Sequence, residues 1–260
     1  MGTSYGRLAA LVLAAALALP PGARAADEEI QVYMDDMDAP GTFGLDVHTN
    51  YVATGSSEPD APGDGQSPLH RVRITPEWSY GASKNVELGL YLPLATFEGN
   101  GRIQAAGIKG RIKWLAPHAD GQDWFWGLNL EVGRVNHTLD VNPWNAELKG
   151  FWGVRKGPVT FAMNANLDWT LSGRAPSPAS LDIDAKLAVT VRKGLDLGLE
   201  TYNGFGPFKS LGHFGQEDQT IYAAADLSLG KWDLNLGVGH GYGGNRDGLV
   251  LKAIIGVPIS

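Results

Sequence analysis

The most constraining feature of this sequence is a strict alternation of apolar and polar residues between positions 159 and 200. Every second residue is apolar over 159–171, and the pattern returns over 181–192 and, after the turn Lys193-Gly194, over 195–200. Successive side chains of a strand point to opposite faces, so a period of two predicts strands. These runs exceed the usual ~5–6 residues of soluble sheets and match the ~9–11 residues that cross a bilayer at a tilt.

The same alternation recurs along the chain and predicts strands throughout. They are expected at 42–54, 69–80, 85–97, 102–116, 123–137, 144–155, 159–171, 181–192, 195–202, 219–229, 232–238 and 249–259. Loops after odd-numbered strands are mostly long and those after even-numbered strands mostly tight, as in bacterial outer-membrane barrels, which have an even number of strands. Tryptophans and tyrosines cluster on the apolar face near the tight turns, as an interfacial girdle would: Trp78, Tyr80, Trp114, Trp124, Trp126, Trp152 and Trp232. We therefore predict an all-β fold, a 12-stranded antiparallel up-and-down transmembrane β-barrel.

The N-terminus predicts a cleaved signal peptide over residues 1–25. Arg7 precedes an apolar run from Leu8 to Leu19, and Ala23-Arg24-Ala25 forms a small-x-small cleavage site. Residues 26–41 are acidic and lack the ligand spacing of a loop-type metal site, so we expect a solvated periplasmic lead-in rather than a cation site. The barrel is expected over 42–260.

Composition excludes several classes of function. The net charge of −7 argues against a nucleic-acid partner. The absence of cysteine rules out a disulfide framework, a thiolate zinc site and a cysteine nucleophile. We expect no cofactor and no metal. No later apolar run is long enough for a transmembrane helix, so membrane residence requires a barrel.

The polar face of the strands is predicted to line the lumen, because a mid-membrane Arg or Lys facing lipid costs ~2–4 kcal/mol. The candidate selectivity residues on this face are Arg71, Arg73, Glu77, Glu87, Lys109, Arg111, Lys113, Glu131, Glu147, Lys149, Asp168, Asp184, Lys186, Glu200 and Asp226. Two interpretations stay open. In one, these residues pair into a network that fills a closed lumen. In the other, a basic ladder (Arg71, Arg73, Lys109, Arg111 and Lys113) faces an acidic wall around Asp168, Asp184 and Glu200 across a narrow aqueous pore.

Catalytic motifs are weak. Residues 237–241 are rich in glycine but precede no helix, and the chain has no G-x-S-x-G elbow. His48, His137 and His240 leave a barrel-embedded hydrolase as an alternative, but no serine stands at a recognisable spacing. We expect a protein that is not an enzyme.

Two prolines and one loop lead to further predictions about the shape of the barrel wall and its rim. Pro76 and Pro93 interrupt strands, and each predicts a bulge or a lateral gap in the wall. The loop 202–218, with Phe205, Phe208 and Phe214, is expected either to fold inward as a constriction or to cap the rim.

Several stretches resemble one family. They are Glu29-Ile30-Gln31-Val32-Tyr33 with Asp38-Ala39-Pro40-Gly41, Asn145-Ala146-Glu147-Leu148-Lys149 with Gly157-Pro158, Leu167-Asp168-Trp169, the run 231–239, and Lys252-Ala253-Ile254-Ile255-Gly256. Together they resemble proteobacterial outer-membrane β-barrels of the phenol-degradation meta-pathway transporter-like type. The chain departs from such barrels at Pro258-Ile259-Ser260, where they usually end in an aromatic residue. The resemblance implies a bacterial outer-membrane location and passage of small, including aromatic, compounds.

The expected function is a narrow passive channel for small polar or aromatic solutes. A plugged structural or surface-interaction barrel is the alternative. The expected partners are outer-membrane lipid and lipopolysaccharide, small solutes, and the barrel-assembly machinery during biogenesis, with no nucleic acid.

Overall fold

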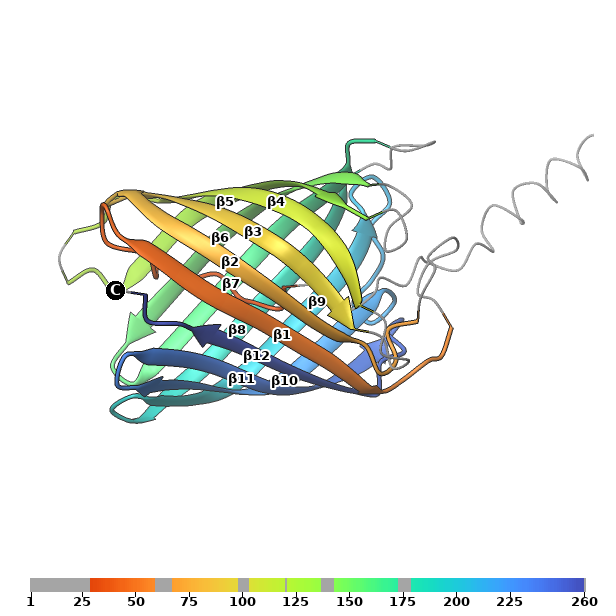
Figure 1. Ribbon diagram of the computed structural model, residues 1–260. Coiled ribbons are helices and arrows are strands. Elements are labelled where there is room, and N and C mark those ends of the chain that lie inside the picture. The colour runs from red at the N-terminus through yellow and green to blue at the C-terminus, as the bar shows by residue number, and fades with distance from the viewer. Residues whose placement is uncertain are drawn as a thin grey trace, which may run out of the picture.

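A computed structural model describes residues 29–58, 67–97, 103–119, 121–136, 143–172 and 179–259, which form a closed antiparallel barrel (Figure 1). The predicted signal peptide lies outside these residues. The strands are β1 (Phe43–Thr54), β2 (Val72–Ser83), β3 (Val86–Phe97), β4 (Ile103–Leu115), β5 (Trp124–Val135), β6 (Trp144–Lys156), β7 (Val159–Thr170), β8 (Ser180–Arg192), β9 (Leu195–Pro207), β10 (Asp218–Leu229), β11 (Trp232–Gly243) and β12 (Leu249–Gly256). Within the described part of the chain, no helix is long and apolar enough to span a membrane.

Each strand pairs with its neighbours in sequence, and the first and last strands close the sheet. β1 and β12 pair from Asp46↔Gly256 to Thr54↔Leu249. Closure removes the free edges that would otherwise recruit other strands. The prediction of an all-β, 12-stranded antiparallel up-and-down barrel is confirmed.

The outer face of the barrel wall is apolar and the inner face is polar, the opposite of the arrangement in a soluble protein. In β5 the side chains alternate strictly between exposed and buried along the whole strand. The exposed set includes Leu128, Leu130 and Val132, each about two-fifths accessible, whereas Asn129 and Glu131 on the inner face are buried. An exposed apolar face of this extent is typical of a surface that contacts other apolar groups.

Tight glycine turns define one end of the barrel. Gly157, Gly194 and Gly230 connect β6 to β7, β8 to β9 and β10 to β11, with φ of 59°, 75° and 70°. Only glycine adopts such positive φ without steric cost. The predicted tight turns are confirmed at these positions. We call this the short-turn end, at the left of Figure 1, and the opposite end the long-loop end.

Three strands run at least three residues further than their sequence pattern predicts. β2 continues to Ser83, β9 to Pro207 and β11 to Gly243, so the expected turn after β2 and the expected loops 203–218 and 239–248 are shorter. In β11 the inward glycines leave room for large neighbours: a Cβ on Gly239 would lie 2.3 Å from the ring of Tyr222. β12 ends at Gly256, because Pro258 has no N–H to continue the ladder.

The prolines produce the predicted bulges. The β2–β3 register shifts between Ile74 and Glu77, beside Pro76, and the β3–β4 register shifts between Tyr91 and Leu94, beside Pro93. A missing N–H interrupts a ladder at such positions.

On the inner face of β5 and β6, each of two phenylalanine rings packs against a glycine of the neighbouring strand. Phe125 lies opposite Gly153, and Phe151 lies opposite Gly127. A Cβ on Gly153 or on Gly127 would lie 2.2 Å from the facing phenylalanine ring. Each inward glycine therefore provides the space that an inward ring occupies.

Replacing Gly153 by alanine should destabilise the folded barrel by about 1–3 kcal/mol, because the added methyl displaces the Phe125 ring. Gly150→Ala in the same strand is the matched control, since its Cβ would meet only Leu128 Cδ2, at 3.8 Å. Urea unfolding of protein refolded in lipid vesicles measures both. Equal midpoints for the two variants would contradict the interlocking.

Candidate functional site

The N-terminal segment, residues 29–40, lies inside the barrel. Ile30, Val32 and Tyr33 are 8%, 5% and 3% exposed. Ile30 packs on Val52 and Val250 towards the long-loop end. The expectation of a solvated periplasmic lead-in is therefore wrong for the described residues. The physical reason is that the lumen offers partners both for the apolar side chains of the segment and for its polar groups.

Tyr33 anchors the segment to the wall. Its backbone N–H donates to Asn164 Oδ1 at 2.7 Å, and Asn164 Nδ2 donates to its carbonyl at 3.0 Å. Its hydroxyl lies 2.8 Å from Glu29 Oε1, 3.0 Å from Tyr91 Oη and 3.0 Å from Glu131 Oε1. The side chain of Asn164 thus pairs with the backbone of the segment as a neighbouring strand would.

Three cations surround the Tyr33 ring. Lys149 Nζ lies 4.2 Å from the ring centroid, Lys113 Nζ 5.3 Å, and the Arg111 guanidinium carbon 5.8 Å. An aromatic face within about 6 Å of a cation is electrostatically attractive, most strongly where water is excluded. The ring therefore offsets part of the mutual repulsion of these cations.

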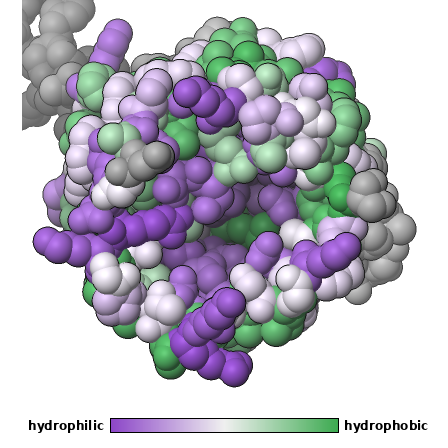
Figure 2. Space-filling model, turned by 90° about the vertical axis from the view of Figure 1, so that its left-hand side faces the viewer, coloured by the Kyte–Doolittle hydropathy of each residue, from purple (hydrophilic) through white to green (hydrophobic). Residues whose placement is uncertain are grey.

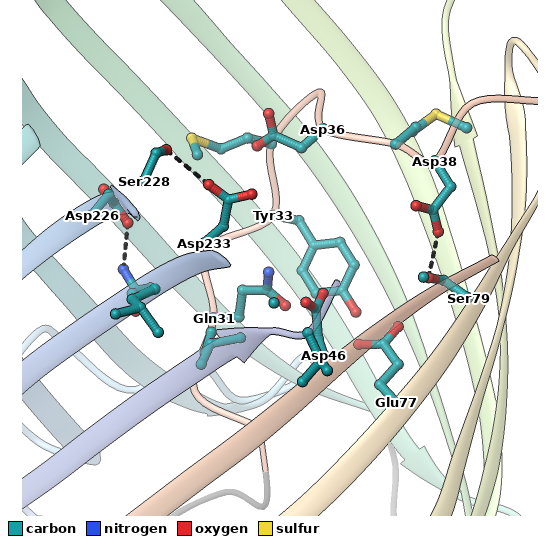
Figure 3. Close-up of a pocket in the computed structure, with 18 of the residues that line it drawn as sticks. Gln31, Tyr33, Asp36, Asp38, Asp46, Glu77, Ser79, Asp226, Ser228 and Asp233 are labelled. Carbon is teal, nitrogen blue, oxygen red and sulfur yellow. Dashed lines mark hydrogen bonds between the residues drawn. The ribbon is translucent and has the colours of Figure 1, made fainter. Parts of the chain in front are cut away.

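Acidic and backbone groups of the segment also bind polar side chains of the wall. Arg155 Nη2 lies 2.5 Å from Asp35 Oδ1, and Lys113 Nζ donates to the Asp36 carbonyl at 2.6 Å. Towards the short-turn end, Ser79 Oγ donates to Asp38 Oδ2 at 2.5 Å (Figure 3). The acidic residues of the segment are therefore partners of the wall.

A second polar cluster surrounds Lys252 on β12. Its ammonium donates to the Ile30 carbonyl at 3.0 Å and to Tyr202 Oη at 3.1 Å, and it pairs with Glu200. Lys186 bridges Glu200 at 3.1 Å and Asp226 at 2.6 Å. This cluster holds the start of the segment against β9, β10 and β12.

The structure places the predicted lumen residues on the inner side of the wall. Fourteen follow the inward alternation of their strands, and Arg71 is buried directly before β2. The inward strand residues are Arg73, Glu77, Glu87, Lys109, Arg111, Lys113, Glu131, Glu147, Lys149, Asp168, Asp184, Lys186, Glu200 and Asp226. Their part in selectivity stays a prediction.

These charges do not form a basic ladder facing an acidic wall, and that expectation is wrong. Arg111 pairs with Glu77 at 2.5 Å and with Glu87 at 2.8 Å. Lys109 pairs with Glu131 at 2.9 Å. Further along the wall, Lys149 pairs with Glu147 at 3.1 Å, while Asp184 accepts a hydrogen bond from Asn166 at 2.7 Å. Arg71 and Arg73 lie at the long-loop end near Asp247. Opposite charges mix locally because a buried charge is costly unless it is paired.

A cavity of about 770 Å³ occupies the lumen at the short-turn end (Figure 3). The segment and β1, β9, β10, β11 and β12 contribute most of its lining, and β2, β3, β4, β6 and β8 contribute one or two residues each. Its lining holds nine acidic and six basic side chains. Viewed from this end, the mouth is hollowed and mostly hydrophilic (Figure 2). The lumen is thus hollow at the short-turn end, and beside this cavity the segment buries Ile30, Val32 and Tyr33 in it.

Among the residues that the structure describes, the histidines form no catalytic arrangement and the loop 202–218 forms no constriction. His48 is buried with Nε2 3.0 Å from a Glu77 carboxylate oxygen, and His240 binds the Gly248 carbonyl. His137 lies outside the described residues. Phe208 and Phe214 are 58% and 61% exposed, so of the two expectations for their loop, capping the rim fits and an inward constriction does not.

Sequence reasoning missed the aromatic and amide residues that hold the segment, namely Tyr33, Tyr91, Asn164, Tyr202 and Tyr222. A signal was present. Phe125 and Phe151 interrupt the polar alternation of the inner face, which indicates an apolar partner inside the lumen.

Comparisons with known proteins identify the fold. No protein-family model matches the chain, and no curated protein is significantly similar to it. An outer-membrane channel from Pseudomonas putida F1 is 12% identical with a TM-score of 0.57, over 88% of this chain and all (100%) of that one. The NanC porin is 11% identical with a TM-score of 0.52, over 83% and 99%. This chain shares the barrel fold of outer-membrane proteins.

Replacing Tyr33 by alanine should free the segment, because it removes the hydroxyl contacts and the ring that three cations surround. The chain has no native cysteine, so Val32→Cys reports on burial directly. We expect a water-soluble maleimide to label Val32→Cys slowly, and many-fold faster when Tyr33→Ala is added. Phe208→Cys, at an exposed position, should react rapidly in both backgrounds and serves as the control. Unchanged labelling of Val32→Cys would contradict the anchoring role.

Proposed function

We propose that this protein is a channel of the bacterial outer membrane for small hydrophilic solutes, closed in the present state by its own N-terminal segment. The observation that carries the proposal is the lumen itself. A water-accessible cavity of about 770 Å³ with a charged lining opens at the short-turn end, inside a wall whose outer face is apolar. A barrel with a polar interior and an apolar outer band suits an aqueous path through lipid.

The outer surface supports the membrane location. Trp78, Trp124, Trp126, Trp152 and Trp232 are 39–47% exposed on this surface, and they lie near the short-turn end of their strands. Amphipathic rings concentrate at the two membrane interfaces. In this proposal the apolar band meets outer-membrane lipid and lipopolysaccharide, after insertion by the assembly machinery that outer-membrane barrels use.

The charge of the mouth supports a preference for cations. Acidic side chains outnumber basic ones around the cavity. Asp46 and Asp233 line it together with Asp38 (Figure 3). A ring of carboxylates raises the local concentration of cations and lowers that of anions. Passage of small aromatic solutes, in a transporter of the phenol-degradation type, rests on the sequence resemblance.

A plugged structural barrel is the second candidate, and one observation favours it. The segment supplies partners to cations of the wall. Asp35 pairs with Arg155, and the Ile30 carbonyl accepts a hydrogen bond from the buried Lys252, which also pairs with Glu200. In that case the segment belongs permanently to the fold. An embedded hydrolase has no comparable support, since the partner of His48 is a carboxylate.

Planar-bilayer recording of the mature protein distinguishes the two candidates. We expect rare or small openings from the full mature chain, and steps several-fold larger when residues 26–38 are deleted, because the deletion empties the lumen. Both proteins should keep the heat-modifiable gel migration of a folded barrel. A folded deletion variant without conductance would favour the plugged structural barrel.

Removing carboxylates from the mouth of the cavity should reduce the preference of the channel for cations over anions. Asp46→Asn with Asp233→Asn removes two carboxylates from the cavity lining, so the reversal potential in a salt gradient should move towards zero. Glu58→Gln, at an exposed position at the long-loop end, is the control and should leave it unchanged. These measurements are best made in the deletion background, where conductance is largest. An unchanged potential in the double variant would contradict the role of the mouth.

A further inference from the structure

A cluster of metal-ligating side chains joins the N-terminal segment to the barrel wall. Glu29 comes from the segment, His48 from β1 and Glu77 from β2. One ligand atom of each lies within 4.8 Å of the others, and His48 and Glu77 are buried. We propose that these three residues bind a divalent transition-metal ion, with zinc as the best match. The proposal goes beyond channel function and does not depend on it.

The donor set suits zinc. One imidazole nitrogen with two carboxylates is a ligand combination that zinc accepts, with bonds of about 2.0–2.2 Å. The separations within 4.8 Å are slightly wider than such bonds require. Rotation of the Glu29 side chain, on a segment without regular secondary structure, can close the difference.

A second observation points to a ligand at this position. The His48 side chain is only 2% exposed. Its Nε2 faces Glu77 Oε2 at 3.0 Å, and its Nδ1 has no hydrogen-bond partner among the residues that the structure describes. A buried polar atom without a partner is costly, and native structures usually satisfy it. Either nitrogen can coordinate a metal once it has no proton, so the ring is able to serve as a ligand.

Charged neighbours surround the cluster and orient its ligands. Asp46 and Glu87 add negative charge beside Glu77, while Arg111 and Lys113 near Glu77 and Lys149 near Glu29 add positive charge. Arg111 pairs with Glu77 Oε1, which leaves Oε2 directed at His48. The Tyr33 hydroxyl donates to Glu29 Oε1 at 2.8 Å and so keeps that carboxylate close to the other two ligands. Outer-shell hydrogen bonds of this kind orient metal ligands.

A bound ion would fasten the segment to the wall beside the Tyr33 anchor. Glu29 reaches the site only while the segment lies in the lumen, so binding and occlusion are thermodynamically linked. A ligand that binds only the occluded state stabilises that state.

Calorimetric titration of the refolded, tag-free mature protein with zinc chloride tests the site. We expect one zinc per barrel. Glu29→Gln and His48→Gln should each weaken binding by at least about tenfold, the range seen when groups around a metal site are lost. Glu29→Gln leaves the wall intact, so it remains informative if His48→Gln does not fold. Glu77→Gln is unsuitable, because it also removes a partner of Arg111.

His118→Gln is the control, at an exposed histidine outside the cluster. It should bind zinc as the unaltered chain does. In the unaltered protein, zinc should also raise the temperature at which the barrel loses its heat-modifiable migration, and Glu29→Gln should abolish that rise. The proposal is overturned if no one-to-one binding saturates, if Glu29→Gln binds as tightly as the unaltered chain, or if His118→Gln removes binding.

Discussion

Local pairing of buried charges is the constraint on which the interior of this barrel depends. An unpaired ammonium or guanidinium in the lumen would cost several kcal/mol, so each cation needs an acid or a carbonyl within reach. The wall meets part of this need through contacts such as Arg111 with Glu77 and Lys109 with Glu131. The segment meets another part, because Arg155 pairs with Asp35 and Lys252 donates to the Ile30 carbonyl. The N-terminal segment is therefore part of the charge balance of the lumen.

The kind of contact that holds the segment determines how it can leave. Its apolar contacts come from Ile30, Val32, the ring of Tyr33, Met34 and Met37, and its other contacts are hydrogen bonds and ion pairs. Water can replace hydrogen bonds at small net cost, whereas it cannot replace apolar contacts. A lumen that fills with water as the segment moves would solvate Lys113 and Arg155 again. A polar attachment therefore makes closure compatible with later opening.

The sequence was sufficient to predict the strands and faces of the barrel wall, but not the contacts of the side chains and of the segment inside the lumen. Alternation in β5, β7 and β8 predicts strands and faces well, because every second side chain meets a different solvent. The ends of β9 and β11 were missed, since inward glycines such as Gly239 carry no polarity signal. The charge pairs depend on strand register, tilt and rotamers, so Arg111 meets Glu77 across the intervening strand β3. The pairing of Asn164 with Tyr33 joins residues 131 positions apart, which no local pattern reveals.

The attachment of the segment to β1 constrains how opening can occur. The chain turns at Gly41, whose N–H donates to the Gly81 carbonyl at 2.7 Å, and φ of 82° at Gly41 directs the segment back into the lumen. Gly81 has no room for a side chain, because a Cβ there would lie 2.3 Å from the Ala39 carbonyl oxygen. This close approach fixes the pivot at the short-turn mouth. Twelve residues from such a pivot reach at most about 40 Å when extended, enough to leave the lumen through that mouth. The cavity is lined both by the segment and by β9 to β12, so movement of the segment towards those strands meets solvent rather than packed side chains.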